Sequence, residues 1–170
     1  MQKSNVYLVG LMGSGKTSIG KILAKRMGMK FIDLDAEIIK DQQCSISEIF
    51  DRFGEEEFRH LENKKLLSTL DIDNCVISTG GGIVMDQDNI KIMLKNGSII
   101  HLDLDLETQL LRIKNKKNRP LLRDINNERE ILAKMREERD HIYKRIAVAS
   151  VDTSNKKRND IVSEVVNIIE

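Results

Sequence analysis

Residues 6–19 read VYLVGLMGSGKTSI, and this stretch decides the fold. A run of four apolar residues ends at Gly10, and the eight residues from Gly10 to Thr17 have the spacing G-x-x-x-x-G-K-T. Apolar residues then recur at helical spacing up to Gly28, a typical helix stop; they are Ile19, Ile22, Leu23 and Met27. The stretch therefore predicts a strand, a glycine-rich loop and a helix, in the order that a P-loop requires.

Each residue type in this loop has a physical role in holding phosphate. Gly10, Gly13 and Gly15 let the backbone turn its N–H groups inward, and the helix that follows adds the positive end of its dipole. Lys16 brings a positive charge to the outer phosphates, and the Thr17 hydroxyl can ligate Mg²⁺. An ordinary glycine-containing turn would not require the Lys-Thr pair, so the stretch predicts a nucleotide-phosphate site.

Length and composition indicate one soluble domain. The chain has 170 residues, of which 40% are apolar and 32% charged, and its net charge of +1 argues against a general nucleic-acid binder. The N-terminal residues lead directly into a strand, and no apolar run approaches membrane-spanning length, so we expect neither a signal peptide nor a membrane segment. Cys44 and Cys75 lack metal-binding spacing, which favours a reduced, cytoplasmic protein.

Two carboxylates follow the first helix. Residues 30–35 read KFIDLD and predict a second strand, in which the i, i+2 spacing of Asp33 and Asp35 places both on the same side of an extended chain. At the carboxyl edge of a parallel sheet that side can face the P-loop. The alternative is that Asp35 caps the helix that follows, whereas Asp33 has no evident helix to cap.

The next region predicts two helical stretches. Residues 45–48 read SISE, a capping-box pattern, and Gly54 interrupts the helix that it starts. Glu55 to Glu57 place negative charge in the first turn of a second helix running to about residue 70. Arg59 lies four residues after Glu55, and the spacing alone favours an exposed ion pair.

Residues 74–79 predict a buried third strand that runs into Gly80-Gly81-Gly82. Three successive glycines indicate close approach to the backbone, and the alternative is a mobile turn. Residues 114–127 contain five basic side chains and Pro120, the only proline; the basic residues are Lys114, Lys116, Lys117, Arg119 and Arg123. This segment is either a solvated basic loop or a lid that closes over a polyphosphate.

The rest of the chain continues the alternation of strands and helices. Helices are predicted over residues 86–95, 106–113, 128–145 and 159–168, and strands over 98–102 and 147–151. Asp105 should cap the helix over 106–113. Right-handed crossovers then predict an α/β fold, with a parallel sheet covered by helices on both faces.

Taken together, these motifs resemble the shikimate kinase family, whose fold is similar to that of the nucleoside monophosphate kinases. The matching pieces occur in the family's order and cover almost the whole chain: GLMGSGKT, FIDLD, GEEEFR, STGGG, NRPLL and RDHIY. The resemblance implies a single three-layer α/β/α P-loop domain over residues 1–170, with a five-stranded parallel sheet in the order 2-3-1-4-5. It also implies a substrate-binding region at about residues 34–61 and a lid at about residues 114–124.

For the nucleotide, the resemblance implies contacts from the P-loop and from three basic residues further along the chain. The expected residues are Gly13, Ser14, Gly15, Lys16, Thr17, Ser18, Arg112, Arg119 and Lys156. Arg112 would lie by the adenine, and Arg119 would reach the transferring phosphate from the lid. Thr17 would ligate Mg²⁺, with Asp33 and Ser78 acting through water.

For the acceptor, the resemblance implies that Arg59 and Arg139 pair with the carboxylate of shikimate, which reverses the interpretation of Arg59 from spacing alone. Asp35 would bind ring hydroxyls, and the loop backbone would contact the substrate at Gly80, Gly81 and Gly82. The expected catalytic residues are Lys16, Asp35 and Arg119.

The implied reaction is ATP-dependent and Mg²⁺-dependent phosphorylation of the 3-hydroxyl of shikimate, a step of chorismate and aromatic amino acid biosynthesis. The expected enzyme is a cytoplasmic monomer whose partner is this small molecule, with no nucleic acid or membrane. Two alternatives stay open: a P-loop kinase for another acceptor such as gluconate or a nucleoside monophosphate, and a non-catalytic nucleotide-binding module.

Overall fold

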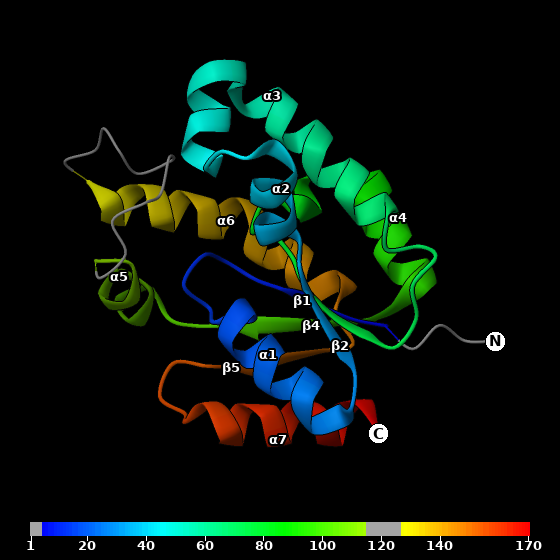
Figure 1. Ribbon diagram of the computed structural model, residues 1–170. Helices are drawn as coiled ribbons and strands as arrows, with labels where there is room; N and C mark the ends of the chain where they lie inside the picture. Colours follow the sequence, from blue (N-terminus) through cyan, green and yellow to red (C-terminus); the bar gives the residue numbers. More distant parts are fainter. Residues whose placement is uncertain (1–4, 115–126) are drawn as a thin grey trace.

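The computed structural model describes residues 5–114 and 127–170 and contains a five-stranded parallel sheet (Figure 1). The strands are β1 (Asn5–Val9), β2 (Lys30–Asp33), β3 (Cys75–Ser78), β4 (Gly97–Asp103) and β5 (Ala149–Asp152). Their order is β2-β3-β1-β4-β5, and all neighbours pair in parallel. The predicted fold class and strand order are therefore confirmed.

Helices cover both faces of the sheet. They are α1 (Lys16–Met27), α2 (Leu34–Gln42), α3 (Ile46–Leu67), α4 (Gln87–Asn96), α5 (Leu106–Lys114), α6 (Glu128–Ile146) and α7 (Arg158–Ile169), with a short 3₁₀ turn η1 at Ile83–Met85. Figure 1 shows α1 and α7 together on one side of the sheet and α4 and α6 on the other. Every predicted helix is present, with end points that differ by a few residues at most.

The central strand β1 explains why the sheet needs both layers. Val6 and Leu8 pack into the cluster formed with α1 and α7, whereas Tyr7 and Val9 pack into the cluster formed with α4 and α6. All four side chains are at most 1% exposed. Successive strand residues point to opposite faces, so a strand buried on both faces is apolar throughout.

The predicted end of the second strand is wrong. β2 stops at Asp33, and the chain turns directly into α2, so Asp33 and Asp35 do not share one side of an extended strand. Asp33, rather than Asp35, is the helix cap, because its Oδ1 accepts a hydrogen bond from Ala36 N at 3.1 Å. Leu34 is fully buried, which holds the first turn of α2 against the core.

The α2–α3 region, which begins the expected substrate-binding segment, has its own small core. Ile38 of α2 packs against Ile49 and Phe58 of α3. The capping box at the start of α3 is confirmed, with Ser45 N donating to Glu48 Oε2 at 2.7 Å and Glu48 N donating to Ser45 Oγ at 3.2 Å. The predicted interruption at Gly54 appears as a kink inside α3.

The expected lid lies almost entirely outside the described residues. Lys114 is the last residue of α5, and Arg119 belongs to the segment that is not described. Among the helices of the described part of the chain, none combines the length and hydrophobicity needed to cross a bilayer.

Leu8→Ala should test the central position of β1. Leu8 is fully buried, so its truncation should lower the free energy of unfolding by about 2–5 kcal/mol through lost burial and a residual cavity. Chemical denaturation measures this change. The matched control is Leu94→Ala in α4, where the side chain is 54% exposed and the effect should stay within about 0.5 kcal/mol. Equal effects of the two substitutions would contradict the assigned core.

Candidate functional site

The P-loop connects β1 to the first turn of α1. Gly15 is the residue before the helix and has a φ of 93°, a left-handed conformation that favours glycine. The Lys16 ammonium lies over the loop and donates hydrogen bonds to Gly10 O at 2.7 Å and to Leu11 O at 3.1 Å. The ammonium thus lies against carbonyl oxygens of the loop at the start of α1, and the free N–H groups and dipole of a helix N-terminus suit phosphate.

The far side of the loop is held by α5. Gln109 Nε2 donates to Met12 O at 3.0 Å, and the Arg112 guanidinium donates to Gly13 O at 3.1 Å and to Thr153 Oγ1 at 3.0 Å. Arg112 therefore lies directly against the P-loop. Its expected contact with adenine stays a prediction.

The two serines of the motif differ in their surroundings. Ser14 is fully buried, whereas the Ser18 hydroxyl donates to Gly15 O at 3.1 Å inside the first turn of α1. Both residues lie in the phosphate-binding stretch, and their contacts with nucleotide stay predictions.

Oxygen atoms suited to Mg²⁺ gather at the start of α1. Thr17 Oγ1 donates to Asp33 Oδ2 at 2.6 Å, and Ser78 of β3 is the register partner of Asp33. Hydroxyl and carboxylate oxygens are the donors that Mg²⁺ prefers, usually with several water ligands kept. The residues present therefore fit the expected ion.

The three consecutive glycines lie where side chains approach the backbone closely. A Cβ at Gly82 would be 2.4 Å from the Arg59 guanidinium nitrogens. A Cβ at Gly80 would be 2.2 Å from Glu62 Oε1 and 3.2 Å from Asp35 Oδ1. The predicted close approach is present, and it brings residues of α2 and α3 to the end of β3.

Gly81 connects this group of residues to the P-loop. A Cβ at Gly81 would be 3.5 Å from Gly10 O and 3.7 Å from Arg139 Nη1. Arg139 lies on α6 and is 8% exposed, and its Nε–H has no hydrogen-bond partner among the described residues. The structure thus places Asp35, Arg59 and Arg139 around one glycine loop that touches the P-loop.

Glu62 belongs to this group and was missed in the sequence. Its side chain is fully buried, and its Oε2 accepts from Arg59 Nη1 at 2.8 Å, while Glu55 accepts from Arg59 Nη2 at 3.1 Å. Burial raises the pKa of Glu62 from 4.5 to about 7, an effect that outweighs the opposing attraction of Arg59. The sequence did contain a signal for this contact, because Glu62 lies three residues after Arg59, a spacing that allows an ion pair on a helix. Only the i, i+4 pair of Glu55 and Arg59 was considered.

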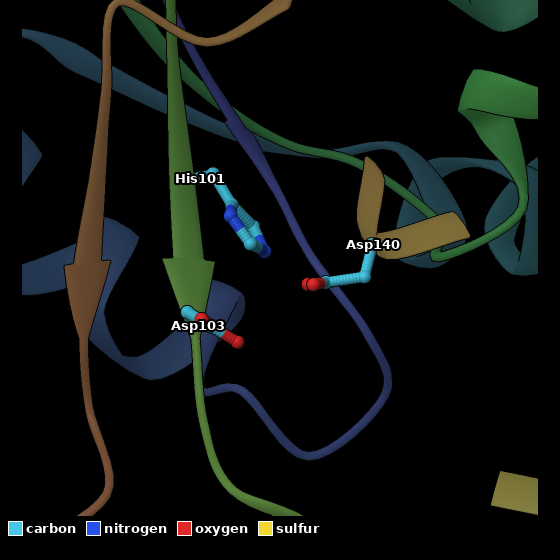
Figure 2. A group of neighbouring side chains, drawn as sticks. All are labelled: His101, Asp103 and Asp140. Carbon is cyan, nitrogen blue, oxygen red and sulfur yellow. The ribbon is translucent and has the colours of Figure 1, made fainter. Parts of the chain in front are cut away.

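A second group of polar side chains lies between β4 and α6. His101 and Asp103 of β4 and Asp140 of α6 point toward one another (Figure 2), with potential ligand atoms within 4.8 Å. Lys144 lies 2.6 Å from Asp140, and Arg136 lies 3.6 Å from Asp103. Because these cations already compensate both carboxylates, we interpret the group as an ion-pair network that ties α6 to the sheet.

The described structure places Lys156, another expected nucleotide residue, in a contact with α7. Lys156 is exposed, and its ammonium pairs with Glu164 of α7 at 2.5 Å, which raises the pKa of the lysine. Arg119 lies outside the described residues. Both assignments stay predictions.

The raised pKa of Glu62 should make stability depend on pH. The folded protein binds the proton of the Glu62 carboxyl group more tightly than the unfolded chain does. The stabilisation from this proton is therefore complete below pH 4.5 and is lost as the pH rises to about 7. Glu62→Gln keeps a neutral side chain, so its free energy of unfolding should rise relative to wild type across this window. Denaturation at several pH values measures the difference, and Glu57→Gln, at an exposed position of α3, controls for charge removal. A difference that is constant with pH would contradict the assignment.

The chain is similar in sequence to known shikimate kinases. The family model for shikimate kinase matches residues 12–170. A shikimate kinase of Sulfurihydrogenibium sp. (strain YO3AOP1) is 40% identical over 166 residues, covering 98% of each chain. A shikimate kinase of Persephonella marina is 41% identical over 165 residues, covering 97% of this chain and 98% of the relative.

The same relationship appears in three dimensions. The structure of a shikimate kinase from Acinetobacter baumannii in complex with shikimate superposes with a TM-score of 0.94 at 33% identity, covering 98% of this chain and 93% of the other. With a P-loop, a five-stranded parallel sheet and matches over nearly the full length, the chain belongs to the shikimate kinase family.

Proposed function

We propose that this protein transfers the γ-phosphoryl group of ATP to the 3-hydroxyl of shikimate. The observation that carries the proposal is the placement of Asp35, Arg59 and Arg139 around Gly80–Gly82, beside the Lys16 loop. A phosphate-binding loop and an anion-binding group thus share one edge of the sheet. Membership of the shikimate kinase family supports the choice of acceptor.

The carboxylate of shikimate binds to the two guanidinium groups. Arg59 approaches Gly82 from α3 and Arg139 approaches Gly81 from α6, so both cations lie beside the same glycine loop. Each planar guanidinium can hold a carboxylate through two parallel hydrogen bonds. Glu62 holds Arg59 from one side and reduces the cost of keeping that cation partly buried. Asp35 and the backbone of Gly80, Gly81 and Gly82 then bind the ring hydroxyls of shikimate.

The triphosphate binds to the P-loop. Backbone N–H groups from Gly13 to Ser18 receive the phosphate oxygens, and Lys16 supplies the positive charge. Thr17 would ligate Mg²⁺, and Asp33 and Ser78, which lie beside it, would act through water. When bound, Mg²⁺ neutralises charge on the β- and γ-phosphates. Arg112 and Lys156 contact the nucleotide, and Arg119 reaches the transferring phosphoryl group.

The transfer itself needs little covalent help from the protein. The 3-hydroxyl oxygen forms a bond to the γ-phosphorus, the bond from that phosphorus to the β,γ-bridging oxygen breaks, and ADP leaves. Asp35 orients the hydroxyl and accepts its proton. A loose transition state requires little deprotonation of the nucleophile, so an ordinary carboxylate is an adequate base. Lys16 and Arg119 stabilise the charge on the equatorial oxygens.

We further propose a monomeric, cytoplasmic enzyme in one domain, with the lid at about residues 114–124 and the substrate-binding region at about residues 34–61. The net charge of +1 and the absence of a basic excess support a small-molecule partner over nucleic acid. The two thiols, Cys44 and Cys75, are free, as a reducing compartment allows.

An ADP-release assay tests the acceptor. The protein is offered ATP and Mg²⁺ with shikimate, gluconate, AMP or CMP in separate reactions. Shikimate alone should give sustained ADP release, and the product should carry its phosphate on the 3-hydroxyl. Turnover with gluconate or a nucleotide in place of shikimate would establish a different kinase, and ATP binding without turnover would establish a non-catalytic module.

Lys16→Ala and Arg59→Ala should affect different kinetic constants. Lys16→Ala removes a cation that acts on the transferring group, so kcat should fall by on the order of a thousandfold. Arg59→Ala removes a substrate contact, so the KM for shikimate should rise most. Steady-state kinetics measure both, and Arg52→Ala is the control because Arg52 is an exposed arginine of the same helix. An unchanged KM for shikimate in Arg59→Ala would refute the carboxylate assignment.

A further inference from the structure

Tyr143 is a buried polar residue that the mechanism above does not use. It lies on α6, one turn after Arg139, and its side chain is fully buried. Its hydroxyl donates a hydrogen bond to Gly81 O, across 62 positions of sequence, and also forms a hydrogen bond with the Arg139 side chain. A hydroxyl on the same helix as one substrate arginine therefore binds the backbone of the glycine loop.

The peptide that Tyr143 holds has a particular place in the site. Gly81 lies close to the P-loop, since a Cβ there would be 3.5 Å from Gly10 O and 3.7 Å from Met12 N. The same Cβ would be 3.7 Å from Arg139 Nη1. A trans peptide is planar, so a hydrogen bond to Gly81 O also fixes the direction of the Gly82 N–H, which points the opposite way.

The Tyr143 ring is held on its other side by β4. The His101 ring stacks on it with centroids 5.0 Å apart and an interplanar angle of 21°. His101 Nδ1 is in turn 2.9 Å from Ser150 Oγ, and Figure 2 shows the imidazole between β4 and α6. Burial raises the pKa of Tyr143, so its hydroxyl keeps its proton and remains a donor. The ring thus has little freedom to release Gly81.

We propose that Tyr143 is a positioning residue for shikimate: its hydroxyl fixes the Gly81–Gly82 peptide, so that the glycine loop presents its backbone to the acceptor in one orientation. The proposal rests on the proposed function, because it assigns the loop to shikimate binding. If the hydroxyl had a purely structural role, its removal would change stability without raising the KM for shikimate relative to the KM for ATP.

Tyr143→Phe tests this role, with Tyr7→Phe as the matched control. Tyr7 is equally buried, and its hydroxyl contacts Thr69 Oγ1 at 3.3 Å rather than the glycine loop. In Tyr143→Phe the KM for shikimate should rise about tenfold, while the KM for ATP stays within about twofold of wild type. Tyr7→Phe should leave both constants within about twofold. A KM for shikimate that is unchanged in Tyr143→Phe, or a rise of equal size for both substrates, would overturn the proposal.

Hydrogen exchange gives a readout that does not depend on activity. In protein without substrate, the amides of residues 80–85 should exchange faster in Tyr143→Phe than in wild type, and Tyr7→Phe should leave them unchanged. Equal exchange in wild type and Tyr143→Phe would overturn the positioning role even if the enzyme phosphorylates shikimate. If exchange is faster in Tyr143→Phe but the wild-type protein does not phosphorylate shikimate, the proposed function is contradicted while the hydrogen bond to Gly81 is established.

Should Tyr143→Phe fail to fold, the wild-type protein can be tested by NMR with ¹³Cζ-labelled tyrosine. The chain contains two tyrosines, so two resonances are expected, and Tyr7→Phe assigns them. Saturating shikimate should shift the Tyr143 resonance and leave that of Tyr7 in place. A Tyr143 resonance that does not move when shikimate binds would overturn the proposal.

Discussion

The structure depends on the close approach of charged side chains to the backbone at Gly80–Gly82. Arg59 and Glu62 occupy the space that side chains at Gly82 and Gly80 would fill. The loop can therefore contact both α3 and the P-loop, which brings the proposed anion-binding arginines close to the proposed phosphate site. A single methyl group at Gly82 would force the guanidinium of Arg59 away from its present position.

Charge balance explains how these side chains remain partly buried. Arg59 is held by two carboxylates, Glu62 at 2.8 Å and Glu55 at 3.1 Å, so its guanidinium is oriented in the folded protein without substrate. Arg139 is 8% exposed and contacts Tyr143, while its Nε–H is without a partner among the described residues. We propose that a carboxylate on the acceptor compensates this buried cation, which would favour a small organic acid over a neutral alcohol. Preorganised cations lower the entropic cost of binding because they need little rearrangement.

The sequence predicted the features that local patterns determine. The P-loop, the capping box at Ser45 and the helix break at Gly54 follow from spacing, whereas the strand order came from the family resemblance. The predicted end of β2 was wrong because an Asp at this position can either continue a strand or cap a helix. Asp33 accepts a hydrogen bond from Ala36 N, so it caps α2. Tyr143 was missed because its contact with Gly81 spans 62 positions of sequence, which periodicity does not reveal. Glu62 was missed because its complete burial comes from the fold, although its contact with Arg59 is local.

Calorimetric titration of Gly82→Ala tests the central claim most directly. Gly82 has a φ of −89°, which alanine adopts without strain, so the substitution changes only the space available to Arg59. We expect the affinity for shikimate to fall by about tenfold or more while the affinity for ATP stays within about twofold of wild type. An unchanged affinity for shikimate in a folded Gly82→Ala protein would contradict it.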